Sequence, residues 1–124
     1  MIYLDTHVLV WLYAKKLNAF TESGLQHIEE HSLLFAPIIR LELQYLKEIQ
    51  KITVDPLEII DYLRRTIDLQ ECTHSYRDVV AESVHFGWTR DPFDRLIVAQ
   101  AKLASAKLLT KDRNILQHAE NAFW

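Results

Sequence analysis

Short runs of apolar, β-prone residues alternate with helical segments along the whole chain, and this alternation restricts the fold more than any other feature. Apolar runs this short are typical of buried strands, because a helix needs a longer periodic segment. Strands that alternate with helices predict a parallel sheet with helices on both faces. We therefore expect the α/β class, as a three-layer α/β/α sandwich with a short parallel sheet. The predicted strands are residues 2–4, 33–36, 68–72, 106–110 and 122–124.

Helical segments fill the intervals between these strands. Pro56 and Pro92 each follow an aspartate, and this pair favours a helix start because Asp caps backbone N–H groups and proline suits the first turn. The segment after Pro92 is apolar on most of its circumference, so we expect it to be buried. Residues 110–114 are polar and are predicted to form a loop at a strand end. The predicted helices are residues 7–13, 20–31, 38–51, 55–65, 75–86 and 92–104.

Length and composition favour one domain over residues 1–124. Hydrophobic residues make up 49% of the chain, which allows a real core. Cys72 is the only cysteine, which excludes an internal disulfide and fits a reducing compartment. No apolar run approaches the about 20 residues that span a bilayer, and the N-terminus lacks the basic region of a signal peptide. We expect a cytoplasmic protein without membrane contact.

The formal net charge of -3 argues against a broad nucleic-acid-binding surface, because such surfaces are usually basic. Any polyanion would therefore need local cations. Arg40, Arg95, Lys111 and Arg113 are the candidates that the predicted elements place near strand ends. Simple solvation of these side chains is the alternative for each of them.

Two carboxylates begin the helix at Pro92. Asp91 suits the N-cap, and Asp94 lies in the first turn at the edge of the predicted buried face. One cap needs only one carboxylate, so Asp94 is surplus to the capping role. The alternative is that both acids simply favour the positive end of the helix dipole.

Glu42 is the most unusual residue of the predicted helix 38–51. On a helical wheel it falls within an apolar stripe that contains Ile38, Tyr45 and Ile49. Glutamate is rarely buried without a partner, so this position calls for a cation, a metal ion or a raised pKa. An ion pair with a nearby arginine is the structural alternative.

Two further acids, Asp5 and Asp112, follow predicted strands. Right-handed crossovers place strand ends and the following helix starts on one rim of a parallel sheet, so Asp5, Glu42, Asp94 and Asp112 are expected to converge. For Asp5, a simple capping role with Thr6 is the alternative. Converging carboxylates repel one another, and Mg²⁺ or Mn²⁺ neutralises them through oxygen ligands. The chemistry that such a site suits is metal-assisted hydrolysis of phosphodiester bonds.

Four segments, taken in order from end to end, resemble a known family. The chain looks like a PIN-domain nuclease of the VapC toxin type, and the Asp-Pro-Phe-Asp-Arg segment is the most specific part of the likeness. The segments are Tyr3-Leu4-Asp5-Thr6, Leu41-Glu42-Leu43, the stretch from Asp91 to Ala101, and Leu108-Leu109-Thr110-Lys111-Asp112.

This resemblance implies an α/β/α sandwich with Mg²⁺- or Mn²⁺-dependent endoribonuclease activity on RNA. It also implies a homodimer and a cognate antitoxin protein that plugs the acidic groove. By motif position, the resemblance makes Asp5, Glu42, Asp94 and Asp112 the catalytic, metal-binding acids. Asp91 becomes an auxiliary acid or a cap, and the hydroxyls of Thr6 and Thr110 orient waters or acids. These two threonines and Asp91 are the auxiliary positions.

The chain departs from the family pattern just before Asp91. Relatives of this type often carry a histidine there, whereas this chain has Trp88-Thr89-Arg90. The departure leaves open what the segment before Asp91 does, and it does not affect the acids.

Other functional classes remain as alternatives. The His27-Ile28-Glu29-Glu30-His31 segment matches an inverted zinc-protease pattern, but the wheel places both histidines towards solvent and no third ligand has a supporting context. A PIN-type nuclease that matures RNA is a second alternative. A nuclease-like fold that only binds, without catalysis, is a third, and the full set of acids argues against it.

Overall fold

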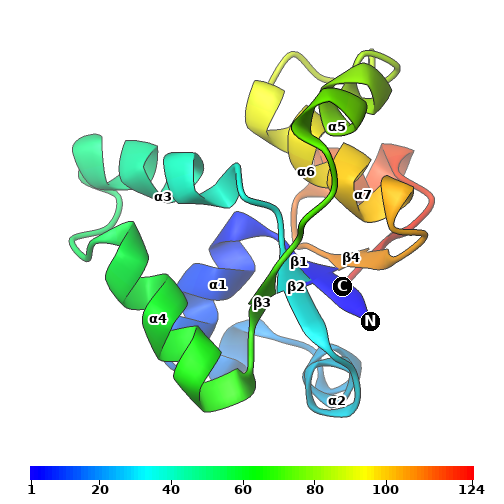
Figure 1. The fold of residues 1–124 in the computed structure, drawn as a ribbon. Coiled ribbons are helices and arrows are strands. Elements are labelled where there is room, and N and C mark those ends of the chain that lie inside the picture. The colour runs from blue at the N-terminus through cyan, green and yellow to red at the C-terminus, as the bar shows by residue number, and fades with distance from the viewer.

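The computed structural model describes all residues from Met1 to Trp124 and has a five-stranded sheet at its centre (Figure 1). The strand order is β3-β2-β1-β4-β5, and every pair of neighbours is parallel. The first strand therefore lies in the middle of the sheet, and the expected α/β/α fold is confirmed. The strands are β1 (Ile2–Leu4), β2 (Leu33–Phe35), β3 (Gln70–Glu71), β4 (Lys107–Leu109) and β5 (Ala122–Phe123).

Helices lie on both sides of the sheet. Figure 1 shows α1, α3 and α4 on one side, and α5, α6 and α7 on the other. The two helix pairs with the most extensive contacts are α1 with α4 and α5 with α6. None of the helices has the length and apolar character that crossing a membrane requires. The helices are α1 (Thr6–Tyr13), η1 (Leu17–Ala19), α2 (Glu22–Glu30), α3 (Ile39–Glu48), α4 (Pro56–Ile67), α5 (Tyr76–Ser83), α6 (Pro92–Leu103) and α7 (Arg113–His118).

β1 runs through the centre of the hydrophobic core. Ile2, Tyr3 and Leu4 are at most 2% exposed, and Val8 and Leu9 of α1 pack into the same core. A strand that is covered on both faces has no solvated side, so its sequence is continuously apolar rather than alternating. The same packing holds the residue that follows Leu4 in a fixed position at the strand end.

α6 forms as its sequence predicts. One carboxylate oxygen of Asp91 accepts hydrogen bonds from the N–H groups of Phe93 and Asp94, at 2.8 and 3.3 Å. Residues 97–101 are all buried against the sheet. Lys102, near the end of α6, forms an ion pair with Glu82 at 2.9 Å. The cap and the buried middle of the helix together fix where its first turn lies.

The buried face of α3 differs from the predicted one. Tyr45 and Ile49 of the predicted stripe are 48% and 43% exposed. α3 carries apolar side chains on two neighbouring sides, so the wheel alone could not tell which side faces α1, α4 and α6. Glu42 lies between the two sides and is half-buried. The residues that α3 buries are Ile39, Leu43 and Leu46.

Two further predictions were wrong. Arg113 and Asn114, which end the predicted polar loop 110–114, begin the helix α7 instead, since a single buried residue, Ile115, is enough to dock so short a helix. His27 does not point to solvent, because its ring packs against Phe123 of β5 at 4.9 Å and stacks on His31 at 5.1 Å. The wheel could not anticipate that the edge strand β5 would lie beside α2.

Candidate active site

The carboxyl ends of β1 and β4 lie side by side at the point where the strand order of the sheet reverses. β1 has β2 on one side and β4 on the other, and parallel sheets have a crevice beyond the strand ends at such a point. The N–H of Asp5 donates to the carbonyl of Leu109 at 3.1 Å, which joins the two strand ends. The helices α1 and α7 begin directly after this junction. The first turns of α3 and α6 bring two more acids towards it.

Asp5 is the most deeply placed of these acids. It is 7% exposed and accepts hydrogen bonds from the hydroxyl of Thr110 at 2.6 Å and from the N–H of Thr6 at 2.7 Å. Burial raises the pKa of Asp5, while these two hydrogen bonds act in the opposite direction. Both carboxylate oxygens are therefore held in a fixed orientation by groups that are themselves fully buried.

Glu42 approaches the site from α3. Its carboxylate accepts a hydrogen bond from the hydroxyl of Thr6, and it forms no ion pair. The arginine nearest in sequence, Arg40, instead binds Glu71 through two hydrogen bonds of 2.7 and 3.1 Å. Burial, followed by the charge of Asp5, raises the pKa of Glu42 to about 7. The structure thus contradicts the alternative in which a nearby arginine neutralises Glu42.

Among the acids of the site, Asp94 has the fewest contacts that stabilise its negative charge. No hydrogen-bond donor or cation of the protein contacts its side-chain oxygens. Burial is the largest cause that raises the pKa of Asp94, and Asp91 is the next, followed by Asp5 and Asp112. Together they raise the pKa to about 8. A half-buried acid without any partner costs folding free energy, so the protein's own contacts do not explain this position.

Asp91 and Asp112 cap the helices α6 and α7. Asp112 accepts the N–H of Ile115 at 3.0 Å and donates its own N–H to the hydroxyl of Thr110 at 3.0 Å. None of the acids of the site forms an ion pair with lysine or arginine. The capping alternative is therefore satisfied for these two acids and for Asp5, but it leaves Glu42 and Asp94 unexplained.

The donor chemistry of the site suits a hard divalent cation. All of its acidic groups are oxygen ligands, and mutual repulsion is what such a cation relieves. No three acidic, histidine or cysteine side chains lie close enough together to form a complete ligand set on their own. Mg²⁺ commonly binds through one or two carboxylates and keeps several waters, so an incomplete protein shell fits this ion.

Removal of the α6 cap should destabilise the protein by about 1 kcal/mol, the usual cost of replacing an N-cap aspartate with alanine. In Asp91→Ala the N–H groups of Phe93 and Asp94 lose their acceptor. In Asp91→Ser a hydroxyl can still accept, so we expect a free energy of unfolding close to that of the wild type. Urea titration measures both. Equal losses in the two variants would contradict the capping role and assign the effect to the charge.

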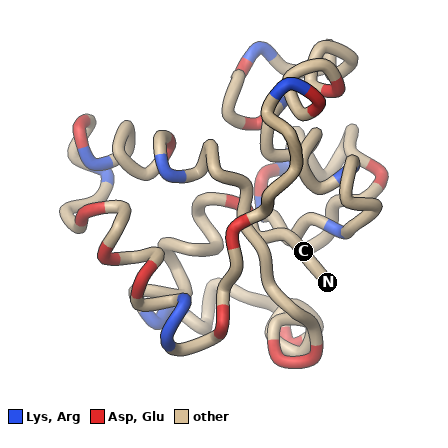
Figure 2. The backbone as a smooth tube through the Cα atoms, in the orientation of Figure 1, with Lys and Arg blue, Asp and Glu red and all other residues tan.

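Only some of the predicted rim cations are available to a ligand. Arg40 is bound to Glu71, and the Nε of Arg95 donates to the carbonyl of Thr89 at 2.9 Å. Arg113 lies exposed at the start of α7. Figure 2 shows acidic and basic residues interspersed along the chain. Lys111 is the cation that lines the cleft beside the acids.

That cleft contains two residues that sequence reasoning did not assign to the site. It has a volume of about 300 Å³ and is lined by Asp5, His7, Trp11, Lys111 and Asp112. The two residues without an assigned role are His7 and Trp11. Their spacing offered a signal, because residues four apart share one side of a helix, and this helix begins directly after Asp5.

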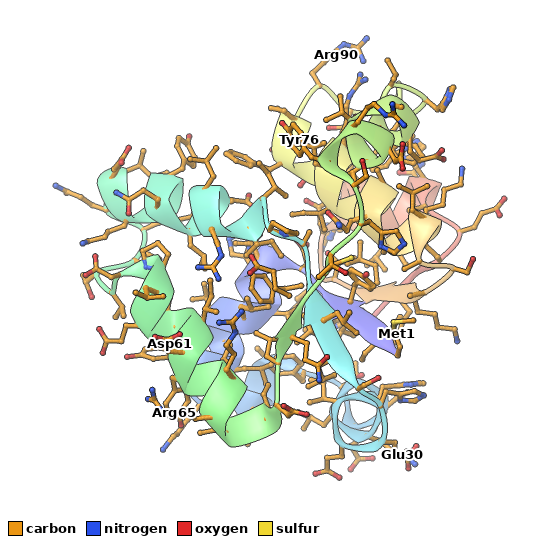
Figure 3. The ribbon with its side chains drawn as sticks, in the orientation of Figure 1. Met1, Glu30, Asp61, Arg65, Tyr76 and Arg90 are labelled. Atoms are coloured by element: carbon orange, nitrogen blue, oxygen red, sulfur yellow. The ribbon has the colours of Figure 1, made fainter.

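The segment before Asp91 is fixed by contacts with neighbouring parts of the chain. The ring of Trp88 stacks on His118 at 5.3 Å, and the hydroxyl of Thr89 accepts the N–H of Asp91 at 3.1 Å. Arg90 donates to the carbonyl of Gly87 at 2.9 Å and projects outward in Figure 3. The segment where relatives often carry histidine therefore supports the α6 start through Thr89.

Comparisons with known proteins define the family to which this fold belongs. The family model of the PIN domain matches residues 2–121. Ribonuclease VapC22 of Mycobacterium tuberculosis strain H37Rv is 29% identical over 121 residues, which cover 94% of this chain and 91% of that protein. The chain belongs to the PIN domain family, and the resemblance seen in the sequence is confirmed.

Solved structures of similar fold come from two toxin–antitoxin systems. VapBC2 from Rickettsia felis, bound to a DNA fragment from its promoter, gives a TM-score of 0.68 at 19% identity, covering 99% of this chain and 96% of that one. A toxin–antitoxin complex from Klebsiella pneumoniae gives a TM-score of 0.63 at 15% identity, covering 100% and 97%. At these identities the likeness supports the fold of the chain.

Proposed function

We propose that this chain is a divalent-metal-dependent endoribonuclease and the toxin component of a toxin–antitoxin pair. Membership of the PIN domain family and the likeness to a protein named Ribonuclease VapC22 support the ribonuclease class. The single observation that carries the assignment to this site is the carboxylate of Asp94. It is half-buried, has no partner, and lies in the field of the neighbouring acids, which is what a cation-binding carboxylate looks like before the cation binds.

In this proposal Asp5, Glu42, Asp94 and Asp112 surround the metal ion, one or two of them bind it directly, and the others bind it through its waters, because no three of them lie close enough together for a direct ligand set. When bound, Mg²⁺ or Mn²⁺ supplies Lewis-acid activation of water and neutralises charge on the phosphate. The protein's own side chains orient the acids. The Thr110 hydroxyl fixes one oxygen of Asp5, and the Thr6 hydroxyl fixes Glu42.

Positioning extends to the helix ends. The cap at Asp91 sets the direction of the first turn of α6 and so of Asp94, while the cap at Asp112 sets the start of α7. The buried hydroxyls also keep bulk water away from the rear of the acids, because Thr6 and Thr110 are fully buried. A site that is held this rigidly needs little reorganisation during the reaction.

The activity test uses the purified chain on a panel of structured RNAs, with Mg²⁺, with Mn²⁺ and with a chelator. We expect cleavage with either metal and none with the chelator, because the carboxylates cannot polarise a phosphate on their own. Restored cleavage after the metal is added back excludes irreversible unfolding. Cleavage that persists in the chelator, from protein free of a contaminating nuclease, would contradict the metal-dependent mechanism.

The proposed partners are a cognate antitoxin and a second copy of the chain. The two solved toxin–antitoxin structures support the antitoxin, whose binding over the acidic groove would block access to the site. An apolar stripe on α5 supports self-association, since Tyr76, Val80 and Val84 are 72%, 39% and 67% exposed at a spacing of four residues. Figure 3 shows Tyr76 on the outer side of α5. Light scattering of the purified chain measures the mass in solution.

A further inference from the structure

The cleft beside Asp5 and Asp112 has a second wall that the proposed reaction does not use. His7 and Trp11 project from neighbouring turns of α1, with their ring centroids 6.0 Å apart. Lys111 comes from the segment between β4 and α7 and lines the same cleft, with its ammonium over the Trp11 ring. We refer to His7, Trp11 and Lys111 together as the aromatic–lysine wall. It faces the same space as two of the proposed metal-binding acids.

No acid of the protein neutralises the charge of Lys111. Its ammonium lies 5.7 Å from the centroid of the Trp11 ring and 5.6 Å from that of Trp124. It forms no ion pair, although Asp5 and Asp112 line the same cleft. The cation is therefore positioned by aromatic faces, and its hydrogen-bond donors stay free for a ligand.

The indole of Trp11 packs against two other aromatic rings. It meets Phe20 edge-to-face at 6.1 Å and Trp124 edge-to-face at 5.7 Å, and Phe20 stacks on Trp124 at 5.1 Å. These contacts fix the ring while it remains only partly buried, so ordering it costs a ligand little. His7 is exposed and can adjust its ring.

A rigid aromatic ring beside a free ammonium suits one nucleotide of a single strand. The face of a nucleobase stacks on indole or imidazole rings, and a lysine ammonium contacts the phosphate as a point charge. An acidic peptide could also engage Lys111, but it would leave the stacking surface unused. A base inside a duplex cannot lie on the ring, because its faces are already covered.

We propose that the aromatic–lysine wall binds the nucleotide next to the cleaved phosphodiester, with its base on Trp11 and His7 and its phosphate on Lys111. This inference rests on the proposed ribonuclease function. It assigns His7, Trp11 and Lys111 to the nucleotide that flanks the cut. It also gives the acidic site a local cation, which a chain of net charge -3 needs in order to hold a polyanion.

The binding test uses a labelled single-stranded RNA of mixed sequence and fluorescence anisotropy over a range of salt concentrations. All proteins carry Asp94→Asn, so that the RNA stays intact. We expect Lys111→Gln to weaken binding about fivefold and to reduce the slope of log K against log salt by about 0.7, the value for one phosphate contact on a single strand. The matched control is Lys107→Gln, because Lys107 also lies over an aromatic ring, 5.7 Å from Phe123, at the opposite end of β4. That variant should bind like its parent.

Stacking is tested by tryptophan fluorescence in a Trp88→Phe background. The two remaining tryptophans, Trp11 and Trp124, both contact Lys111. We expect single-stranded RNA to quench their emission, a duplex of the same sequence to quench it less, and His7→Ala to require more RNA for the same quenching. His7 is exposed, so this variant removes a stacking ring without opening the core.

The outcomes separate this inference from the proposed function. Unchanged RNA binding by Lys111→Gln, while the chain without Asp94→Asn cleaves the RNA, would overturn the wall and leave the ribonuclease. If Lys111→Gln weakens only the binding of the antitoxin, the cleft serves the protein partner and the nucleotide assignment is wrong. If the chain without Asp94→Asn cleaves no RNA and the parent binds none, the proposed function fails and the wall fails with it.

Discussion

Asp94→Asn is expected to reduce RNA cleavage by about two orders of magnitude or more while the protein keeps its fold. The substitution preserves the shape of the side chain and removes the negative charge that a divalent cation needs from this ligand. Cleavage assays with Mg²⁺ measure the loss, and circular dichroism verifies the fold. Asp78→Asn is the matched control, because Asp78 occupies the same position in the first turn of α5 as Asp94 does in α6. Full activity of Asp94→Asn would contradict the proposed site.

The same variant should also change how stability depends on pH in the metal-free protein. The pKa of Asp94 is about 8 in the folded chain against an ordinary value of 3.8, and that of Glu42 is about 7 against 4.5. Between these values the folded state binds more protons than the unfolded state, so stability falls as pH rises from about 4 to about 8. Asp94→Asn removes one of the two contributions, and its free energy of unfolding should fall less over this range. Urea titrations with a chelator present measure the difference.

Thr110→Val is expected to lower the free energy of unfolding by about 2 kcal/mol, the usual cost of losing a hydrogen bond to a charged, buried group. Valine has nearly the shape of threonine, but it cannot donate to Asp5 or accept the N–H of Asp112. We also expect cleavage to fall by about tenfold or more, because Asp5 loses the group that fixes its orientation. Chemical unfolding and the cleavage assay measure the two effects.

Thr110→Ser provides the control for this prediction. Serine keeps the hydroxyl and loses only a methyl group, so the hydrogen bonds to Asp5 and Asp112 can still form. Its activity should stay close to that of the wild type, with a stability loss of about 1 kcal/mol from the small cavity. If the serine variant lost as much activity as the valine variant, packing around residue 110 would matter more than the hydroxyl.

Most of the fold could be predicted because its strongest signals are local. Short apolar runs predicted β1, β2, β4 and β5, and the Asp-Pro pairs predicted the starts of α4 and α6. α7 was missed because six residues with one buried side chain carry too little periodicity for detection. The prediction of the buried face of α3 was wrong because both of its apolar sides fit a helical wheel equally well. The packing of His27 against Phe123 depends on a contact between residues that are far apart in the chain.

The sequence indicated which residues form the candidate site, but it did not indicate how they are arranged in space. The Asp-Pro-Phe-Asp segment and the acids after the strands are recognisable in the chain, and their role remains a proposal. The sequence could not indicate that Thr110 holds Asp5, since these residues lie 105 positions apart. Nor could it indicate that Arg40 pairs with Glu71 and so leaves Glu42 without a cation.

The sequence by itself determined the parallel α/β architecture and the family, because helix starts, strand runs and short motifs depend on neighbours in the chain. Only the tertiary structure decided which acids stay uncompensated, which arginine is already bound, and which rings line the cleft with Lys111. Those properties depend on burial and on distances between segments that meet at the strand ends. A carboxylate such as Asp94 acquires its raised pKa when folding removes water and brings other negative charges near it.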